Sequence, residues 1–314
     1  MFRRWIQRIK KYINRKPVVN NPENNPSDNN TEAKTPYDYG AVGDGITDDS
    51  QAFIDLFDNN TDIYIPDGTF LLTCHNKDKS WLDDGGNLMA KGYFNVKSNT
   101  TINCSDNSVI KVKPNDYKAY VVIMINDVEN VTINNMTIVG DRAYHIGSEG
   151  EWGYGIFIAD SNNVTLNDCK TSDLWGDGIN LFSLKEYSGN KNIYINRCTC
   201  TNNRRQGMSI ESGVNVVVTD SKFLYTNGTL PTAGVDIEPA WHTMSVSNVI
   251  FRQCTFSNNR VGLLVDGQFG SVDNITVESS CIFNDNSEGN IYCYKANGIT
   301  VNVHVNGVYF VECN

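Results

Sequence analysis

The sequence has no apolar run long enough to cross a bilayer, so a transmembrane helix is not expected. Its N-terminus is basic but lacks the apolar stretch of a secretory signal, so an ordinary signal peptide is not expected either. Helix-forming residues are scarce, whereas Asn, Gly, Thr, Val and Ile are abundant. This composition favours β structure with many turns.

Basic residues are concentrated in the first sixteen positions, which carry seven Lys or Arg and no acid. The formal net charge of −10 over 314 residues therefore hides a strongly acidic remainder. Such a body repels phosphates, so nucleic acid is not the expected partner. The nine cysteines are odd in number and recur at repeat positions, which argues against a disulfide framework.

Residues 1–16 predict a basic amphipathic helix, because their apolar side chains fall on one helical stripe. The helix could pack on a partner or on its own copies, lie on a membrane surface, or be a frayed tail. Residues 17–35 have few large apolar groups and predict a flexible linker. The stripe consists of Phe2, Trp5, Ile6, Ile9 and Ile13.

A short helix and a long series of repeats follow the linker. "TDDSQAFIDLF" places Phe53, Leu56 and Phe57 at helical spacing behind capping residues, which predicts a short helix that acts as a lid. From about residue 99, strand-like segments that begin with glycine alternate with segments that begin with asparagine. The first set is "GIFIAD", "GINLFS", "GMSIES", "GVDIEP" and "GLLVDG"; the second includes "NVTLNDC", "NIYINRC", "NVVVTDS" and "NVIFRQC".

Several short strands per repeat, without helices, predict a parallel β-solenoid with coils about 4.8 Å apart. Stacking makes each repeat position a column. The seventh residue of the Asn-led set, displaced by one in the last segment, predicts an interior ladder of small thiols, and the leading asparagines predict a structural amide ladder. A metal-binding or disulfide role for the thiols is the alternative. The thiol column reads Met136, Cys169, Cys198, Ser221, Cys254 and Cys281.

"YDYGAVGDGITDDSQAF" followed by asparagine-rich coils resembles the right-handed parallel β-helix of the pectin-lyase-like superfamily, with the entry module of phage tailspikes and pectate-lyase-type glycan enzymes. The resemblance covers residues 36–314. It implies an all-β fold, a right-handed parallel β-helix with a short N-terminal capping helix, preceded by the basic helix and linker. It is weak for reaction, because this fold hosts hydrolases, lyases, epimerases and pure binders.

Alternation in the Gly-led strands points an apolar column inward and a second column toward water. On the outer side Glu211, Glu238 and Asp266 stack on successive coils, with Asp236 beside Glu238. Like charges about 5 Å apart repel each other, so the pKa of at least one carboxyl should rise. The column could be a functional site, a Ca²⁺ site or a tolerated acidic face.

Long loops follow "GINLFS" and "GVDIEP" and flank the short turn at Glu211, which predicts a cleft. Arg204, Arg205 and Asp177 would enter it from the opposite turns. Aromatic faces stack on sugar rings and arginine pairs with uronate or sulfate, so these residue types suit an anionic glycan. Alternatively, the two arginines could serve only as counterions of the acids, and Trp152 and Trp175 could pack within the loops. The other side chains expected to contact the glycan are Trp152, Tyr154, Trp175, Trp241, His242 and Asp266.

Aligned with polygalacturonases of this fold, the chain keeps one catalytic position, Asp177, which matches an acid of their Asp-Asp pair. Their Gly-His-Gly corresponds to residues 205–207, "RQG", and their Arg-Ile-Lys to residues 236–238, "DIE". The resemblance therefore does not carry the polygalacturonase mechanism over, and any catalysis must use a different set of residues.

Two functions are consistent with these patterns. The first is a tailspike-like depolymerase that cleaves an acidic extracellular polysaccharide by hydrolysis or β-elimination, with Asp177, Glu211, Asp236 and Glu238 as acids and bases. No cofactor is expected, apart from the calcium alternative. The second is a receptor-binding appendage protein that holds a surface glycan without cutting it.

Both functions imply an extracellular or virion-associated protein, whose basic helix could attach it to a larger particle. The chain ends in the strand-like "GVYFVECN" without an obvious cap. Because an uncovered solenoid end promotes aggregation, we expect another copy to cover it, as in a homotrimer.

Overall fold

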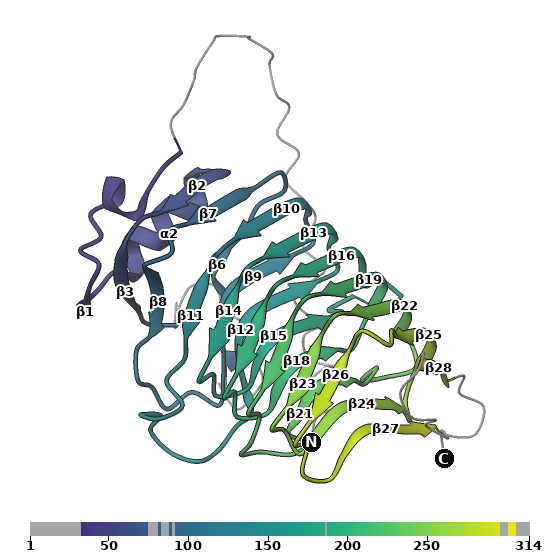
Figure 1. Cartoon of the computed structure of the whole chain (residues 1–314). Coiled ribbons are helices and arrows are strands. Elements are labelled where there is room, and N and C mark those ends of the chain that lie inside the picture. Colours follow the sequence, from purple (N-terminus) through teal and green to yellow (C-terminus); the bar gives the residue numbers. More distant parts are fainter. Residues whose placement is uncertain are drawn as a thin grey trace, which may run out of the picture.

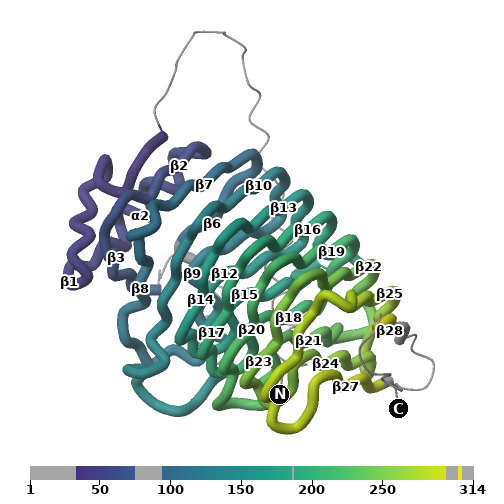
Figure 2. The backbone as a smooth tube through the Cα atoms, viewed as in Figure 1, coloured from purple at the N-terminus to yellow at the C-terminus, as the bar shows by residue number. Residues whose placement is uncertain are grey.

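The computed structural model describes residues 33–74, 81–82, 88–89, 92–185, 187–295 and 301–305. These residues form a solenoid of stacked coils with three parallel sheets as its faces (Figure 1). The coils succeed one another from the N-terminal end, where α2 lies, to β27 near the other end (Figure 2). The predicted helix 1–16, most of the linker 17–35, and the terminal segment "GVYFVECN" lie outside the described residues.

Each coil contributes one strand to each sheet in the order I, II, III. Sheet I consists of β2 (Asp62–Ile65), β7 (Thr101–Cys104), β10 (Glu129–Asn134), β13 (Asn162–Asn167), β16 (Asn190–Asn196), β19 (Gly213–Thr219), β22 (Ser245–Arg252), β25 (Ser271–Val277) and β28 (Val301–Val305).

Sheet II lies on the next face of the solenoid. It consists of β1 (Asp44–Asp48), β3 (Gly68–Leu72), β8 (Ser108–Val112), β11 (Thr137–Val139), β14 (Lys170–Ser172), β17 (Thr199–Thr201), β20 (Lys222–Leu224), β23 (Thr255–Ser257) and β26 (Ile282–Asn284).

Sheet III closes each coil. It consists of β6 (Gly92–Asn95), β9 (Ala119–Asn126), β12 (Trp152–Ala159), β15 (Asp177–Phe182), β18 (Gln206–Ile210), β21 (Ala233–Ile237), β24 (Val261–Gly267) and β27 (Gly289–Lys295). A short antiparallel pair, β4 (Trp81–Leu82) and β5 (Leu88–Met89), stands apart from the three sheets.

The core is one continuous apolar column inside the coils. The alternating Ile, Val and Leu residues of all three sheets point into it, and most of them are completely buried. The predicted thiol ladder is part of this column: Cys169, Cys198 and Cys254 are free and have at most 1% of their surface exposed. A hydrogen bond with a neighbouring cysteine, and then burial, raises the pKa of the Cys198 and Cys254 thiols; the neighbours are Cys169 and Cys281. These cysteines therefore pack as small apolar residues.

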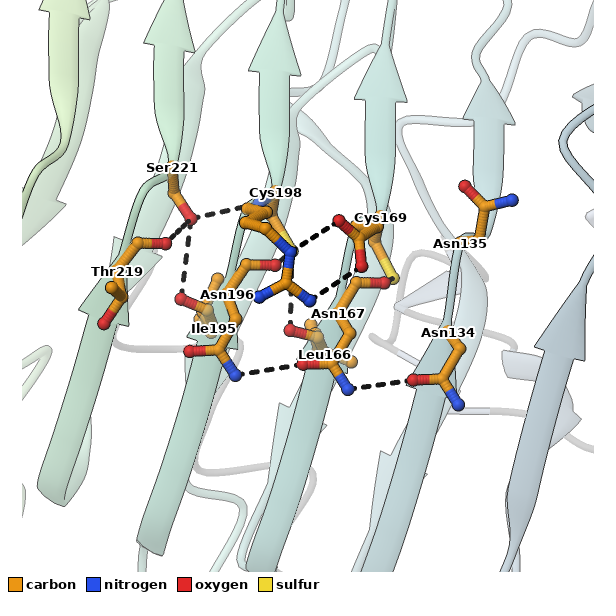
Figure 3. Close-up of polar contacts among 12 residues, drawn as sticks. Asn134, Asn135, Leu166, Asn167, Cys169, Ile195, Asn196, Cys198, Thr219 and Ser221 are labelled. Atoms are coloured by element: carbon orange, nitrogen blue, oxygen red, sulfur yellow. Dashed lines mark hydrogen bonds and ion pairs between the residues drawn. The ribbon is translucent and has the colours of Figure 1, made fainter.

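Side-chain amides form ladders along sheet I. Asn134, Asn167 and Asn196 are linked by amide hydrogen bonds of 2.8 and 3.0 Å from coil to coil (Figure 3). A second ladder follows the asparagines that open the strands, as predicted; Asn163, for example, donates to Asn130 at 2.8 Å. These residues adopt positive φ values near 55°, which asparagine tolerates better than most residues. The ladders thus pair polar groups at the tight turns.

The predicted lid is α2 (Ser50–Asn59), which covers the first coil. It buries Phe53 and Phe57 against Phe94, with ring centroids 5.4 Å apart in both pairs. Asp49 holds the preceding turn, because its carboxylate accepts the backbone N–H groups of Val42 and Gly43 at 2.7 and 3.1 Å. A short 3₁₀ helix, η1 (Pro36–Tyr39), comes before it and packs on α2.

The glycines that open the sheet III segments are required by close backbone approach. A Cβ atom on any of five successive glycines would lie 2.4–2.7 Å from a backbone oxygen one coil further along. Only glycine fits such a contact without moving the coils. The five are Gly155, Gly178, Gly207, Gly234 and Gly262.

Replacing Gly207 by Ala should destabilise the protein by about 1–3 kcal/mol, because the new Cβ would lie 2.4 Å from the carbonyl oxygen of Gly234. Ser247→Ala, a small change on the outer face of β22, is the control and should be close to neutral. Urea unfolding monitored by circular dichroism measures both. Equal midpoints for the two variants would contradict the packing argument.

Candidate active site

The stacked acids lie on the outer face of sheet III, in the predicted register, and we call them the acidic column. Its predicted members are Glu211, Asp236, Glu238 and Asp266. Ser209 of β18 pairs with Asn180 of β15 and with Asp236 of β21. A third position on this face is the residue just before the glycine, because Asp177 and Gln206 contact outward side chains from there. Asp177 occupies it in β15 and contacts Asn180 (Nδ2 to Oδ2, 3.5 Å) and Ser209 (Oγ to Oδ2, 2.8 Å). Asp177 therefore belongs to the column and not to the preceding turn.

The column is not the water-facing surface that alternation predicted. Asp236 and Glu211 are 1% and 6% exposed, so the prediction was wrong for these two acids, and Asp177 beside them is 0% exposed. By contrast, the Glu238 side chain is 34% exposed and Asp266 is half-buried. The cluster therefore meets solvent on the Glu238 side.

A second apolar cluster covers the neighbouring part of this face. Leu184, Ala240 and Met244 come from the two long loops that were expected to form cleft walls, and they pack against outward residues of β9, β12 and β15. Trp241 contacts Phe182 edge-on at 5.6 Å. These loops fold onto the sheet because its outer residues there are apolar. The cluster consists of Val121, Met124, Tyr154, Phe157, Ala159, Phe182, Leu184, Ala240 and Met244.

Arg205 is the cation at the centre of the acids. Its guanidinium bonds Asp177 (Nη1 to Oδ2, 3.2 Å) and lies 4.0 Å from both Glu238 (Nη2 to Oε2) and Glu151 (Nε to Oε2). Its side chain is only 13% exposed. A single buried cation thus faces several carboxyl groups, which cannot all be ionised without strong repulsion.

Burial is the first cause of the raised pKa of every acid in the column. It raises the pKa of Glu211 to about 8, although Arg205 and a hydrogen bond from Asn180 (Nδ2 to Oε1, 3.0 Å) oppose the shift. Burial and then Glu238 raise the pKa of Asp236. Burial also raises the pKa of Glu238, where Asp266 adds to the shift and Arg205 opposes it. Burial likewise raises the pKa of Asp177, against Arg205. Glu211 is therefore mainly protonated at neutral pH.

Arg204 lies apart from the acids, although it precedes Arg205. Its guanidinium stacks on Trp175, 3.9 Å from the ring centroid, and donates to the carbonyl oxygens of Gly150 (2.7 Å) and Ser148 (3.2 Å). Trp175 is 7% exposed and also stacks on His145 at 3.7 Å. Both predicted glycan contacts are thus engaged in holding a loop.

The remaining predicted contacts divide by exposure. Tyr154 is 3% exposed, whereas Trp152 and Trp241 are partly buried against the second apolar cluster. His242 is exposed on the loop that follows β21. Asp266 accepts the backbone and side-chain N–H groups of Gln268 at 2.9 and 3.1 Å. Of this group, His242 is thus the most open to solvent.

Sequence reasoning missed two polar partners of the acids. Gln206 donates to Asp236 (Nε2 to Oδ2, 2.7 Å) and accepts from the backbone N–H of Ala233 at 3.0 Å. Glu151 reaches Arg205 from the end of a long loop. The sequence could have indicated Gln206, because it comes just before the repeat glycine, the position that Asp177 occupies on the preceding coil. Nothing in the sequence pattern pointed to Glu151.

Among the residues that the structure describes, no three His, Cys, Asp or Glu side chains are arranged to hold a metal ion, so the calcium alternative finds no support there. None of the described helices is long and apolar enough to span a membrane.

The free energy of unfolding should fall as pH rises from about 4.5 to about 8. A carboxyl with a raised folded-state pKa stabilises the fold below its unfolded pKa, and this stabilisation is lost as pH rises through the folded value. Glu211→Gln should remove up to about 1.4 kcal/mol per pH unit of that slope. Denaturant titrations across this range test it, with exposed Glu129→Gln as control. An unchanged slope in Glu211→Gln would refute the raised pKa.

Arg205→Gln should lower the free energy of unfolding by about 3–5 kcal/mol at pH 7, because it leaves buried carboxyl groups without their cation. Arg197→Gln is the matched control: its pair with Asp168 (Nε to Oδ1, 2.8 Å) is exposed to solvent, and its loss should leave stability nearly unchanged. Thermal unfolding compares them, and similar losses for both would argue against a central role for Arg205.

Comparison with known proteins supports the fold. Residues 118–238 match the family described as right handed beta helix region. The chain is 30% identical over 221 residues to the uncharacterized protein YclG of Bacillus subtilis (strain 168), covering 64% of this chain and 37% of that protein. It is 26% identical over 242 residues to the pre-neck appendage protein of Bacillus phage B103, covering 69% of this chain and 26% of that protein. It thus spans well under half the length of these relatives.

Solved structures resemble the chain in fold at low identity. PfbA, a surface adhesin of Streptococcus pneumoniae, has a TM-score of 0.58 at 19% identity, over 88% of this chain and 67% of that one. A tailspike protein of Acinetobacter baumannii bacteriophage Fri1, a capsular polysaccharide depolymerase, has a TM-score of 0.54 at 14% identity, over 91% and 59%. The stacked coils, the family match and these likenesses together make the chain a right-handed parallel β-helix, the fold of pectin-lyase-like proteins.

Proposed function

We propose that the acidic column of sheet III hydrolyses a glycosidic bond of an extracellular polysaccharide. The observation that carries this proposal is that two carboxyl groups of unlike exposure lie on neighbouring coils near Arg205: Glu211, 6% exposed, and Glu238, whose side chain is 34% exposed. Glycosidases use such a pair, one carboxylic acid to protonate the leaving oxygen and one carboxylate as base or nucleophile.

Each group has a role that its surroundings support. Glu211 is the general acid, and Asn180 orients its carboxyl through the 3.0 Å hydrogen bond. Glu238 is the base or nucleophile, since its contacts with Arg205 and Asp236 favour the charged form. Asp177 holds Arg205 in place through the 3.2 Å ion pair. Burial raises the pKa of Asp236, and Gln206 orients its carboxyl through the 2.7 Å hydrogen bond.

Hydrolysis fits this site better than β-elimination. Elimination from a uronate needs a cation to neutralise the sugar carboxylate and a base to take the C5 proton. Arg205 already faces Asp177, Glu151 and Glu238. The guanidinium of Arg204 is bound to carbonyl oxygens and to an indole ring. The arginines that were expected to bind an acidic sugar are therefore engaged, and a weakly charged glycan segment suits the cluster.

The similar proteins support a surface location. A phage pre-neck appendage protein, a phage tailspike depolymerase and a bacterial surface adhesin are among the proteins that the chain resembles. We accordingly place the protein outside the cell or on a virion, as a homotrimer attached through residues 1–16. This placement is part of the proposal, because those likenesses establish the fold alone.

A non-catalytic glycan-binding appendage is the second candidate. The burial of Asp177 and Asp236, at 0% and 1% exposed, favours it, because a substrate reaches buried acids only if the covering groups move. In that case the column is structural, and glycan contacts lie elsewhere on the surface.

Glu238→Gln should reduce turnover at least about 100-fold and leave glycan binding largely intact, because it removes the base but keeps the shape. The assay incubates the protein with neutral and acidic polysaccharides and measures new reducing ends, the product of hydrolysis. The ultraviolet absorbance of an unsaturated uronate is measured in parallel, because elimination would produce it. Glu278→Gln, at a surface ion pair with Arg252, is the control. Full turnover in Glu238→Gln would remove the column from the mechanism; no product from the wild type would favour the binder.

A further inference from the structure

Two long loops at the edge between sheets II and III carry a group of exposed apolar side chains. Residues 140–151 connect β11 to β12, and residues 225–232 connect β20 to β21. The turns between them, at 173–176 and 202–205, are short. Four of the exposed large apolar residues among those that the structure describes lie here: Tyr144 (71% exposed), Ile146 (62%), Tyr225 (51%) and Leu230 (67%).

Arg142 joins the two loops across the intervening coils. Its Nη1 donates to the backbone oxygen of Asn202 (2.6 Å) and to that residue's side-chain oxygen (3.1 Å). Its Nη2 donates to the side-chain oxygen of Asn227 (2.6 Å) and to that residue's carbonyl. One guanidinium thus holds residues 140–151, the turn at 202 and residues 225–232 together, so the exposed side chains of both loops share one surface.

The same surface continues into the acidic column through Arg204. Its side chain holds Gly150 and Ser148 of the first loop, and its backbone oxygen accepts from Thr229 of the second at 2.9 Å. The next residue, Arg205, is the centre of the acids, and Glu151 at the end of the first loop lies 4.0 Å from it. The loops therefore begin beside Arg205, the cation that the acids share.

The first loop is held firmly at its base. Asp141 is 1% exposed and accepts from the Tyr120 hydroxyl at 2.8 Å and from the Asn115 amide at 3.0 Å. Its other contact is His145 Nδ1 at 2.7 Å, and the His145 ring stacks on Trp175. Exposed aromatic side chains on a fixed backbone bind a ligand at lower entropic cost than those on a mobile loop.

We propose that the two loops joined by Arg142 form a saccharide-binding platform, on which Tyr144 and Tyr225 stack against sugar rings of a polysaccharide chain that extends from the acidic column. The proposal rests on the proposed function for the identity of the ligand as a glycan. Tyrosine rings present an apolar face that stacks on the apolar face of a pyranose, and their hydroxyl groups can hydrogen-bond with its hydroxyls. A protein partner would be expected to need a larger apolar area than four side chains provide.

Tyr144→Ala combined with Tyr225→Ala should weaken glycan binding about tenfold or more, which corresponds to about 1.4 kcal/mol. The probe is migration of the full chain through native gels that contain polygalacturonate, alginate, hyaluronate, dextran or xylan. All variants carry Glu238→Gln, so the polysaccharide is not cut during the run. Tyr64→Ala combined with Tyr194→Ala is the matched control, because these tyrosines are exposed on sheet I, away from both loops.

We expect a polysaccharide to retard both the parent, which carries Glu238→Gln alone, and the Tyr64/Tyr194 control. The Tyr144/Tyr225 variant should no longer be retarded. Arg142→Gln, which leaves both rings in place, should also weaken retardation, with circular dichroism confirming the fold. Equal retardation of all variants would contradict the proposed platform. A parent that none of the five polysaccharides retards would contradict it too, and would be the result expected of a protein-docking surface. Binding and cleavage are measured separately, so the two proposals can fail separately. Retardation that depends on the tyrosines, without any turnover by the wild type, would reject the hydrolase and support the platform.

Discussion

The in-register stacking of parallel coils is the constraint from which the other features of this protein follow. Each strand bonds to the strand one coil away, so a side chain always lies over its counterpart in the repeat. Apolar counterparts build the core, and asparagines pair their amides at the turns. Where the backbones approach most closely, only glycine fits. The same rule places carboxyl groups over one another on the outer face of sheet III.

Stacked carboxyl groups are unfavourable unless protons or cations offset their repulsion. Both occur in the acidic column: Arg205 supplies one cation, and burial keeps Glu211 and Asp236 protonated well above their usual range of pH. The outcome is a graded set of acids within one cluster, from the buried Asp236 to the partly exposed Glu238. A protonated acid beside a carboxylate is the arrangement that acid–base chemistry on a glycosidic oxygen requires.

Loops at the two edges of sheet III give the regular scaffold its individual surface. At the edge toward sheet I, the loops after β15 and β21 fold onto the sheet and bury its apolar outer residues. At the edge toward sheet II, Arg142 and Arg204 hold two loops over short turns, and their aromatic residues stay exposed. Both arginines thus hold the loops in place, since their guanidinium groups donate to several carbonyl oxygens of the loop backbones.

The repeats determined the solenoid, the thiol and amide ladders and the register that stacks Glu211, Glu238 and Asp266, because these features follow from periodicity and are nearly independent of the loops. The capping helix was determined by its own helical spacing and capping residues, before the repeats begin. Tertiary structure decided which acids are buried, that Arg205 and not Arg204 neutralises them, and that Glu151 joins them. It also made Trp175 and Tyr154 buried packing residues and left Tyr144 and Tyr225 exposed. The physical reason is that loop paths depend on contacts between residues dozens of positions apart, whereas a repeat encodes only the relation of each coil to the next.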